Sequence, residues 1–444
     1  MVCNFNRKRK KSISMHPNRK LFSIWFISLV CIALGVATTP YLSVIPLLLF
    51  FASLLFLQTE EIFALLFGLL PFANIFKLST TSMSLFTICE IGAVIYLLLK
   101  KRLKASQFFM LMALTVYLII SSLNNLNYLT IIKVVVGFLL IGLAMSTFTQ
   151  YGLKQSARIL SLSTIAMLLL STNQRYLSYV EKYFTDLDYY VDSTGHATDT
   201  LRISGFFGDP NYCAVLIVLV LSLLGVLYYY KSIGTEFWLY VAFLVPLGFL
   251  TYSKSYFLCI VLFLILLILF VLFPKHKCWA LVSLIGIGVA VWLVINGRIE
   301  AINMILARFA QGNLTTGRTA LNQVYLQYIY DHTKVFFFGD GISADRFSGV
   351  SNNVHCLYIE ILYKLGIIGA GLYCGTLVAT LSKAKKQIER HFVNYLPLVF
   401  FMLMFGFLAG VVHYALPFYI MIVALTFNYT SLASDKNVGV VMHD

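Results

Sequence analysis

Long apolar segments, separated by short polar breaks, recur along the chain from Leu21 to Leu432. Most are close to the roughly 18 to 20 residues that an α-helix needs to cross the hydrocarbon core of a bilayer. A membrane β-barrel would instead show short strands of alternating apolar and polar residues. The pattern predicts an all-α, polytopic membrane bundle of about 14 spans, near residues 21–38, 41–57, 60–76, 84–99, 107–122, 128–148, 157–171, 210–230, 236–250, 255–273, 278–295, 354–381, 394–411 and 414–432.

The composition supports lipid as the solvent of this chain. Hydrophobic residues make up 60% of its 444 residues, and charged residues make up 11%. A soluble domain carries about a quarter charged residues, which it needs to cover a surface that faces water. A set of soluble globular domains is therefore excluded.

The net charge of +15 is distributed unevenly over the predicted loops. With the N-terminus in the cytoplasm, the inner segments hold 21 Lys and Arg against 6 Asp and Glu, and the outer segments hold 10 of each. This follows the positive-inside rule and indicates anionic lipid as the partner of the basic runs, not nucleic acid. We expect cytoplasmic tails at 1–20 and 433–444 around a single transmembrane domain, 21–432.

Two predicted outer loops, 172–209 and 296–353, are long, with 38 and 58 residues. Loops of this length are usually functional or disordered. In the second loop, residues 298–309 and 316–330 carry apolar residues at spacings of three and four, which predicts amphipathic helices. The second of these helices would place Leu321, Val324, Tyr325, Tyr328 and Ile329 on one face. Such helices lie in the membrane interface or form a folded cap on the bundle. Both arrangements put Arg308 and Arg318 near the outer surface.

Four charged residues fall in the interiors of predicted spans, away from the span ends, where ionisable groups are costly and often functional. Glu360 and Lys364 are four residues apart on one helix, with the acid first, which suits an ion pair. Glu90 and Lys133 could pair between two helices. Structural pairing and proton-coupled transport are both open interpretations of these charges.

The first polar outer segment, Arg202–Asn211, leads directly into a span. Asp209 followed by Pro210 predicts a helix start, with Asp as the N-cap and Pro as the first helical residue. Asp209 therefore has a structural explanation, and Arg202 has none in the local sequence.

Three other outer residues have both a structural and a functional interpretation. Lys254, in a short turn, is either an interfacial anchor or a functional cation. Arg318, at a predicted helix start, either forms a surface salt bridge or binds an anion. His355, where a span opens, is either structural or a base, because His titrates most readily near neutral pH.

Taken together, four motifs resemble the O-antigen polymerase and ligase superfamily, which includes the Wzy-type polymerases. The motifs are Arg202-x-x-Gly-x-Phe-x-Asp-Pro-Asn211, Ser253-Lys254, Gly317-Arg318-Thr319, and His355-x-x-Tyr-x-Glu360 followed by Gly366-Ile-Ile-Gly369. The resemblance covers roughly residues 200–370. It implies a GT-C-like helical bundle that transfers sugar from an undecaprenyl-diphosphate carrier, without a metal or another cofactor, outside the cytoplasm.

The resemblance also implies roles for three residues. Lys254 matches a basic residue that is usually Arg in this superfamily, and Arg318 matches a second Arg; both would contact the pyrophosphate. His355 matches the histidine that is thought to activate the acceptor hydroxyl. Lys254 departs from the pattern, because Lys offers a point charge where Arg offers a bidentate fork.

The chemistry fits these residue types. A departing lipid diphosphate needs cationic stabilisation, which Arg318, Lys254 and Arg202 could supply. A general base such as His355 contributes about 10²–10⁴-fold to the rate. The remaining candidate substrate-binding residues are Asp209, Asn211 and Arg308. The first outer turn, 38–40, has no acidic residue. Metal-using, oligosaccharyltransferase-like enzymes resemble a different pattern, which has acidic residues in that turn.

Several alternatives stay open. A ligase of the same superfamily would share the chemistry and differ in its acceptor. A lipid-linked oligosaccharide flippase can also have many spans, but the long outer loops and the lack of visible repeats disfavour it. A structural assembly partner is a further alternative.

Tyr183, Tyr189 and Tyr190 could line a sugar groove or belong to a plain structured loop.

We predict a polymerase of O-antigen or capsular repeat units in the bacterial cytoplasmic membrane, with its active site on the outer face. Its partners would be the undecaprenyl-diphosphate-linked oligosaccharide and membrane lipid. A chain-length regulator and a flippase are further expected partners.

Overall fold

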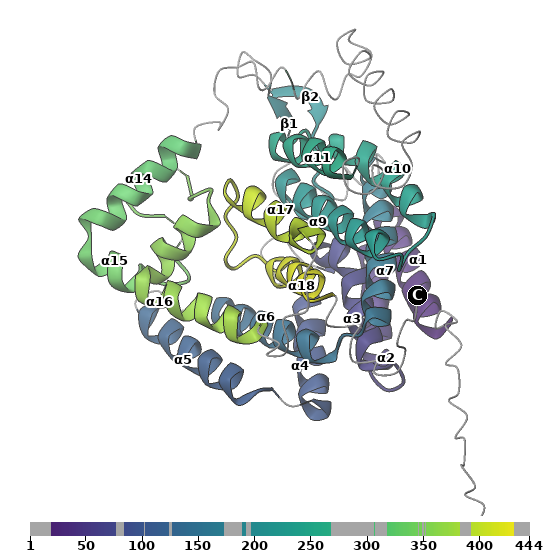
Figure 1. Ribbon diagram of the computed structural model, residues 1–444, viewed down its shortest axis with the longest axis horizontal. Helices are drawn as coiled ribbons and strands as arrows, with labels where there is room; N and C mark the ends of the chain where they lie inside the picture. Colours follow the sequence, from purple (N-terminus) through teal and green to yellow (C-terminus); the bar gives the residue numbers. More distant parts are fainter. Residues whose placement is uncertain are drawn as a thin grey trace, which may run out of the picture.

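Helices dominate the computed structural model of this protein (Figure 1). The structure describes residues 19–76, 84–101, 103–123, 127–172, 189–191, 197–267, 306, 318–344, 346–348, 350, 352–381 and 392–429. The predicted span at 278–295 and the predicted helix at 298–309, apart from Leu306, lie outside these residues.

Six described helices are long and apolar enough to cross a membrane, which supports a multi-pass membrane protein. They are α1 (Arg19–Ala37), α3 (Thr59–Leu69) with its 3₁₀ extension η2 (Leu70–Phe76), α6 (Tyr128–Thr147), α7 (Gln150–Ser171), α9 (Pro210–Tyr229) and α16 (Leu357–Leu381). Shorter helices match other predicted spans: η1 (Pro40–Ser43) with α2 (Val44–Ser53), α4 (Phe86–Lys100), α5 (Ala105–Ser121), α10 (Glu236–Phe249), α11 (Lys254–Leu267), η5 (Phe392–Tyr395) with α17 (Leu396–Phe405), and α18 (Leu416–Phe427). The count of about 14 spans and the GT-C arrangement stay predictions.

Capping residues decide where two of the helices begin. The Asp209 side chain accepts a hydrogen bond from the Asn211 backbone N–H, and Pro210 is the first helical residue of α9, as predicted. Helix α7 starts at Gln150 instead of 157, because Thr149 caps it and its polar first turn is helical. Hydropathy alone places this boundary too late.

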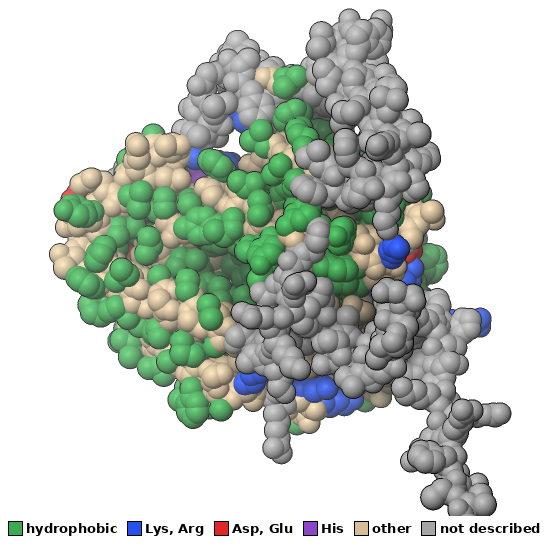
Figure 2. Space-filling view, viewed as in Figure 1, with side chains coloured by type: hydrophobic (Ala, Val, Ile, Leu, Met, Phe, Trp, Pro, Cys, Tyr) green, Lys and Arg blue, Asp and Glu red, His purple; other side chains and the backbone are tan. Residues whose placement is uncertain are grey.

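Helix α9 lies at the centre of the bundle, and almost all of its side chains are buried. It contacts α7, α10, α11, α17 and α18. One face of the molecule shows mainly hydrophobic side chains, and Lys and Arg gather at its lower edge, near the junction of α4 and α5 (Figures 1 and 2). An apolar outer face is what lipid exposure requires.

The first long loop contains a feature that was not predicted. Strands β1 (Tyr189–Val191) and β2 (Ala197–Leu201) pair antiparallel, with Tyr189 opposite Leu201 and Val191 opposite Ala197. This pair of short strands lies in a loop, and the fold of the described residues remains all-α. The tyrosines, valine and threonines of these short segments favour extended backbone.

The second long loop contains α14 (Arg318–Asp331) and α15 (Thr333–Phe338), at the left of Figure 1. Tyr325 and Ile329 of α14 enter a small core with Val335, Val354 and Tyr363, separate from the bundle core. Val324, which belongs to the predicted apolar face, is 47% exposed. The helix therefore forms part of a packed cap, and it also exposes apolar side chains, as an interfacial helix does.

Two predicted spans are interrupted. Helix α16 is kinked at Gly366, which has φ 62°, and a Cβ there would lie 2.5 Å from the backbone nitrogen of Gly339. Helix α17 ends at Phe405 instead of 411, and an irregular segment, Gly406–Ala415, leads to α18. Non-helical backbone at membrane depth is tolerated where it is buried in protein or lines a cavity. This segment, called the broken segment below, lines the cavity described next.

Candidate active site

A cavity of about 510 Å³ lies between the start of α9, α6, the start of α16 and the broken segment. It collects polar side chains from parts of the chain that are far apart in sequence: Asn74, Lys133, Asp209, Asn353, His355, Glu360, Lys364 and His413. Charged and polar groups that converge in one concave site are typical of ligand binding. We take this cavity as the candidate active site.

The Arg202–Asn211 segment is held against the turn at 251–254. Arg202 is 9% exposed, and its Nε donates to the Thr251 carbonyl at 3.1 Å. The Ser253 hydroxyl donates to Asn211 Oδ1 at 3.0 Å. These contacts join the first two sequence motifs, and they give Arg202 the structural contact that its local sequence did not reveal.

Asp209 and Asn211 form a local unit at the start of α9. The Asp209 Oδ1 accepts hydrogen bonds from the backbone nitrogen of Asn211 at 2.7 Å and from its side-chain Nδ2 at 2.8 Å. Asp209 also lines the cavity. The N-cap contact therefore fixes a carboxylate at the edge of the site.

His355 lies two residues before α16 and lines the same cavity. Burial lowers the pKa of His355 below its ordinary value of 6.5, the Arg318 guanidinium lowers it further, and the Asp209 carboxylate acts in the opposite direction. His355, Arg318 and Asp209 belong to three different sequence motifs, and all three motifs therefore contribute to the electrostatic environment of one imidazole. The imidazole is neutral at pH 7 and can accept a proton.

Arg318 begins α14 and connects the cap to the bundle. Its Nη1 donates to the Phe407 carbonyl, in the broken segment, at 2.6 Å. A guanidinium has five N–H donors in a rigid plane, so one such contact fixes the orientation of the others. The Arg318 charge is thereby placed beside His355.

Glu360 holds the backbone of the broken segment. Its Oε2 accepts from the backbone nitrogens of Gly410 at 2.5 Å and Val411 at 2.9 Å. Its Oε1 lies 3.0 Å from Lys364 Nζ, which confirms the pairing that the sequence predicted. The Tyr212 hydroxyl donates to the Ala409 carbonyl. Side chains therefore satisfy backbone groups that a helix would have paired.

His413 is a cavity residue that the sequence analysis missed. Its ring stacks on Tyr212, with centroids 3.7 Å apart and an interplanar angle of 4°. Its Nδ1 accepts from the Ala415 backbone nitrogen at 3.3 Å. This contact leaves Nε2 as the protonated nitrogen of the neutral ring. The only signal in the sequence was a histidine in the short outer turn after Gly410.

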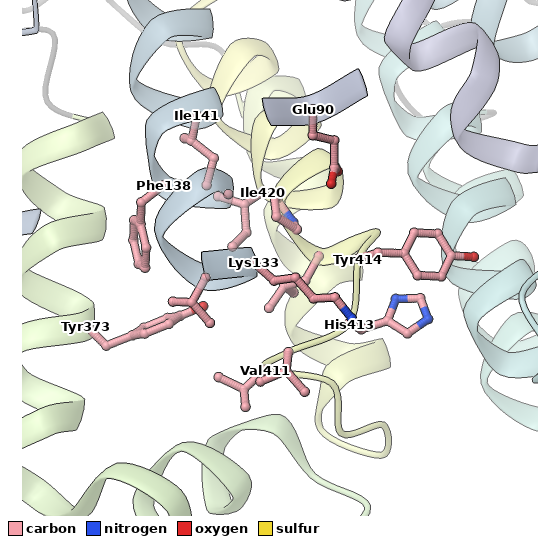
Figure 3. Close-up of a pocket in the computed structure, with 14 residues that line it drawn as sticks. Glu90, Lys133, Phe138, Ile141, Tyr373, Val411, His413, Tyr414 and Ile420 are labelled. Carbon is pink, nitrogen blue, oxygen red and sulfur yellow. The ribbon is translucent and has the colours of Figure 1, made fainter. Parts of the chain in front are cut away.

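Lys133 extends from α6 toward His413, and Figure 3 shows it with Glu90 at a smaller pocket. That pocket has a volume of about 30 Å³ and adjoins the main cavity through Lys133, His413 and Tyr414. The structure records no salt bridge between Glu90 and Lys133, both of which are described residues. Lys133 instead presents its charge to the cavity.

The other predicted site residues are placed differently. Lys254 begins α11, next to Ser253, and does not line the cavity. Arg308 lies outside the described residues.

Among the residues that are described, no group of three or more His, Cys, Asp or Glu could hold a metal ion. The sequence Asp186-Leu-Asp188, whose acid spacing occurs in metal-binding glycosyltransferases, lies in the first long loop and outside the described residues.

Residues 239–374 match the Wzy_C family model, described as O-antigen ligase. The match confirms the resemblance to the O-antigen polymerase and ligase superfamily, whose members are glycosyltransferase-like enzymes. It includes Lys254, Arg318 and His355, but it does not extend to Arg202 and Asp209. Comparison with curated proteins and with solved structures gives no match.

Proposed function

We propose that this protein polymerises undecaprenyl-diphosphate-linked oligosaccharide repeat units at the outer face of the cytoplasmic membrane. The observation that carries the proposal is that His355 and Asp209 line one cavity, while Arg318 is hydrogen-bonded to the broken segment that lines the same cavity. The match of residues 239–374 to the O-antigen ligase family supports the same class of chemistry.

His355 acts as the general base in this proposal. Its neutral imidazole takes the proton of the acceptor hydroxyl while the oxygen forms a bond to the anomeric carbon of the donor sugar. The bond between that carbon and the phosphate oxygen breaks, and the electron pair leaves with the diphosphate. The Asp209 carboxylate favours the imidazolium that forms, because it raises the pKa of His355.

Arg318 stabilises the departing diphosphate. Negative charge develops on the phosphate oxygens as the bond breaks, and an oriented guanidinium offers them bidentate hydrogen bonds. The contact with Phe407 holds that guanidinium before substrate arrives. Lys254 contributes positive charge from the end of the neighbouring turn, and Arg202 does so from the segment that is hydrogen-bonded to this turn. Asn211 and Arg308 complete the proposed substrate contacts.

Reconstituted protein tests this proposal. Liposomes receive the undecaprenyl-diphosphate-linked repeat unit as the only substrate, and the products are separated on a glycan gel. A ladder is expected, because a polymerase uses one substrate as both donor and acceptor. His355→Gln should lower its rate about 10²–10⁴-fold, and Arg318→Ala about 10²–10³-fold.

Matched controls are available on the cap. His332 and Lys334 are exposed residues outside the cavity, so His332→Ala and Lys334→Ala should leave the ladder intact. Wild-type rates in either His355→Gln or Arg318→Ala would remove that residue from the mechanism.

A ligase is the second candidate, and the description of the matching family favours it. A ligase would give no ladder from the repeat unit alone, but it would transfer glycan once a second acceptor is added. No transfer under either condition, with the protein folded, would favour a transporter.

A further inference from the structure

A second hollow lies at the other end of α9 from the candidate active site, and its volume is about 280 Å³. The active-site cavity adjoins Asp209, just before α9, and this hollow adjoins Lys231, just after it. Helix α9 has 20 residues, which corresponds to about 30 Å, the thickness of a bilayer core. The two sites therefore lie at opposite membrane surfaces.

Three cations converge on this hollow from two segments. Lys154 and Arg158 lie one turn apart on α7, and Lys231 lies in the turn after α9. Arg158 is paired, since its Nε lies 3.1 and 3.0 Å from the two carboxylate oxygens of Glu236. Among the described residues, the structure records no ion pair for Lys154 or for Lys231. The Glu236 carboxylate also acts on Lys154, but one carboxylate leaves the three cations with an excess of positive charge.

Two further acids, Glu60 and Glu61, lie near Tyr151 at the edge of the hollow. The Glu60 carboxylate accepts from the Thr149 hydroxyl at 2.6 Å, and the Glu61 carboxylate accepts from the Gln58 backbone nitrogen at 2.9 Å. Neither lines the hollow.

The arrangement is costly without an anion. Lys154 and Arg158 are like charges four residues apart on a helix, which is destabilising. Lys231 has φ 56°, the left-handed conformation that ends α9 just after its C-cap residue, Tyr230. The position of Lys231 at the hollow is therefore set by the end of the helix. An anion between the lysines would offset the charge repulsion.

Neutral polar groups complete the lining. They are Gln150, Tyr151, Gln155, Ser232 and Tyr429. The hydroxyls of Ser232 and Tyr429 are hydrogen-bonded to each other, which ties the turn after α9 to the end of α18. Amides and hydroxyls beside lysines suit the several oxygens of a phosphate group.

We propose that this hollow is a phosphate-binding site, occupied by the headgroup of an anionic phospholipid in the leaflet opposite the active site. Basic pockets between membrane helices on the cytoplasmic side bind such headgroups. Simple topological anchors would be exposed, as Lys100 and Lys101 are, whereas these three cations share one concavity. The proposal does not depend on the polymerase activity.

The test uses full-length protein in detergent, titrated separately with phosphatidylglycerol, phosphatidylcholine and inorganic phosphate, and read by native mass spectrometry. Wild-type protein should retain phosphatidylglycerol in preference to phosphatidylcholine. The double variant Lys154→Gln with Lys231→Gln should lose about thirty-fold in affinity, since each lysine near a membrane surface contributes roughly five-fold.

Two controls separate this site from general surface charge. Lys100→Gln with Lys101→Gln removes the same charge from an exposed position and should leave binding unchanged. Lys231→Arg keeps the charge and should bind as wild type, which also tests that the turn folds. Equal binding by the double variant and wild type, or equal loss in the Lys100 and Lys101 control, would overturn the proposal. Binding of inorganic phosphate with the same dependence on Lys154 and Lys231 would keep the phosphate site and reject the lipid as its source.

Discussion

At the scale of single residues, the environment of His355 decides whether it can act as a base at neutral pH. Burial and Arg318 lower its pKa, and Asp209 raises it. The base form is the neutral form, so activity should be lost only as pH falls through the lowered pKa, below 6.5. His355, Arg318 and Asp209 together therefore set the pH below which activity is lost.

We predict that Asp209→Asn lowers the pH below which activity is lost. The substitution removes the carboxylate that favours imidazolium, while Asn remains a good N-cap, so α9 should still begin at Pro210. The rate of ladder formation, measured from pH 4.5 to 8 for both proteins, gives the midpoint of each profile. An unchanged midpoint would mean that Asp209 does not act on His355.

The sequence predicted some residue contacts and could not predict others. The Glu360–Lys364 pair lies within one helical turn, so the spacing was sufficient to find it. The bonds from Glu360 to Gly410 and Val411 join residues about fifty positions apart, which no local pattern reveals. His413 was missed for the same reason, because its stacking partner Tyr212 lies on a distant helix.

At the scale of elements, helix starts were easier to predict than helix interruptions. Asp209 and Pro210 carry a local capping signal, and α9 begins where they predict. The broken segment is almost as apolar as the helices around it, so hydropathy extended the predicted span to 411. Its backbone is satisfied by Glu360, Tyr212 and Arg318, and those contacts are tertiary.

We predict that Gly410→Ala damages the site. Gly410 has φ 148°, which L-residues rarely adopt, and an added Cβ would lie 2.6 Å from the Tyr212 hydroxyl oxygen. Strain of this kind costs about 1–3 kcal/mol, and relief would displace the Tyr212–Ala409 and Glu360 contacts. Ladder formation in liposomes should fall, with the protein still inserted in the membrane.

Gly371→Ala is the matched control for this prediction. Gly371 lies within α16, and an added Cβ there would have no heavy atom within 4 Å. Ala is a better helix former than Gly, so activity and thermal stability should be maintained. Equal activity in both variants would show that the conformation of Gly410 is not required.

At the scale of the whole molecule, the two polar sites lie at opposite ends of α9, and the charge pattern of the sequence predicts which side of the membrane each would face. The positive-inside count assigned the active-site cavity to the outside and the basic hollow to the inside. The hollow itself depends on α7, α9 and α18 meeting at one end, which follows from packing and not from charge counts.

We predict that opposite ends of the bundle react from opposite sides. In a cysteine-free background, Asn352→Cys should be labelled by a membrane-impermeant maleimide in intact spheroplasts. Lys101→Cys should be labelled only after permeabilisation. Both positions are exposed, so access to reagent is decided by the side of the membrane. Labelling in the reverse order would invert the proposed topology.

The way the broken segment is held has a consequence for how such enzymes diversify. Its backbone is held by Glu360, Arg318 and Tyr212 from outside the segment and by His413 from within it, and none of these side chains is an apolar lining residue of the segment. Leu408, Ala409 and Val412 line the cavity from this segment. Substitutions there can change the shape presented to a sugar while the catalytic geometry persists. If the proposed glycosyl transfer is correct, a lineage under pressure to alter its glycan could therefore evolve new acceptor preferences in small steps, without first losing the transfer reaction.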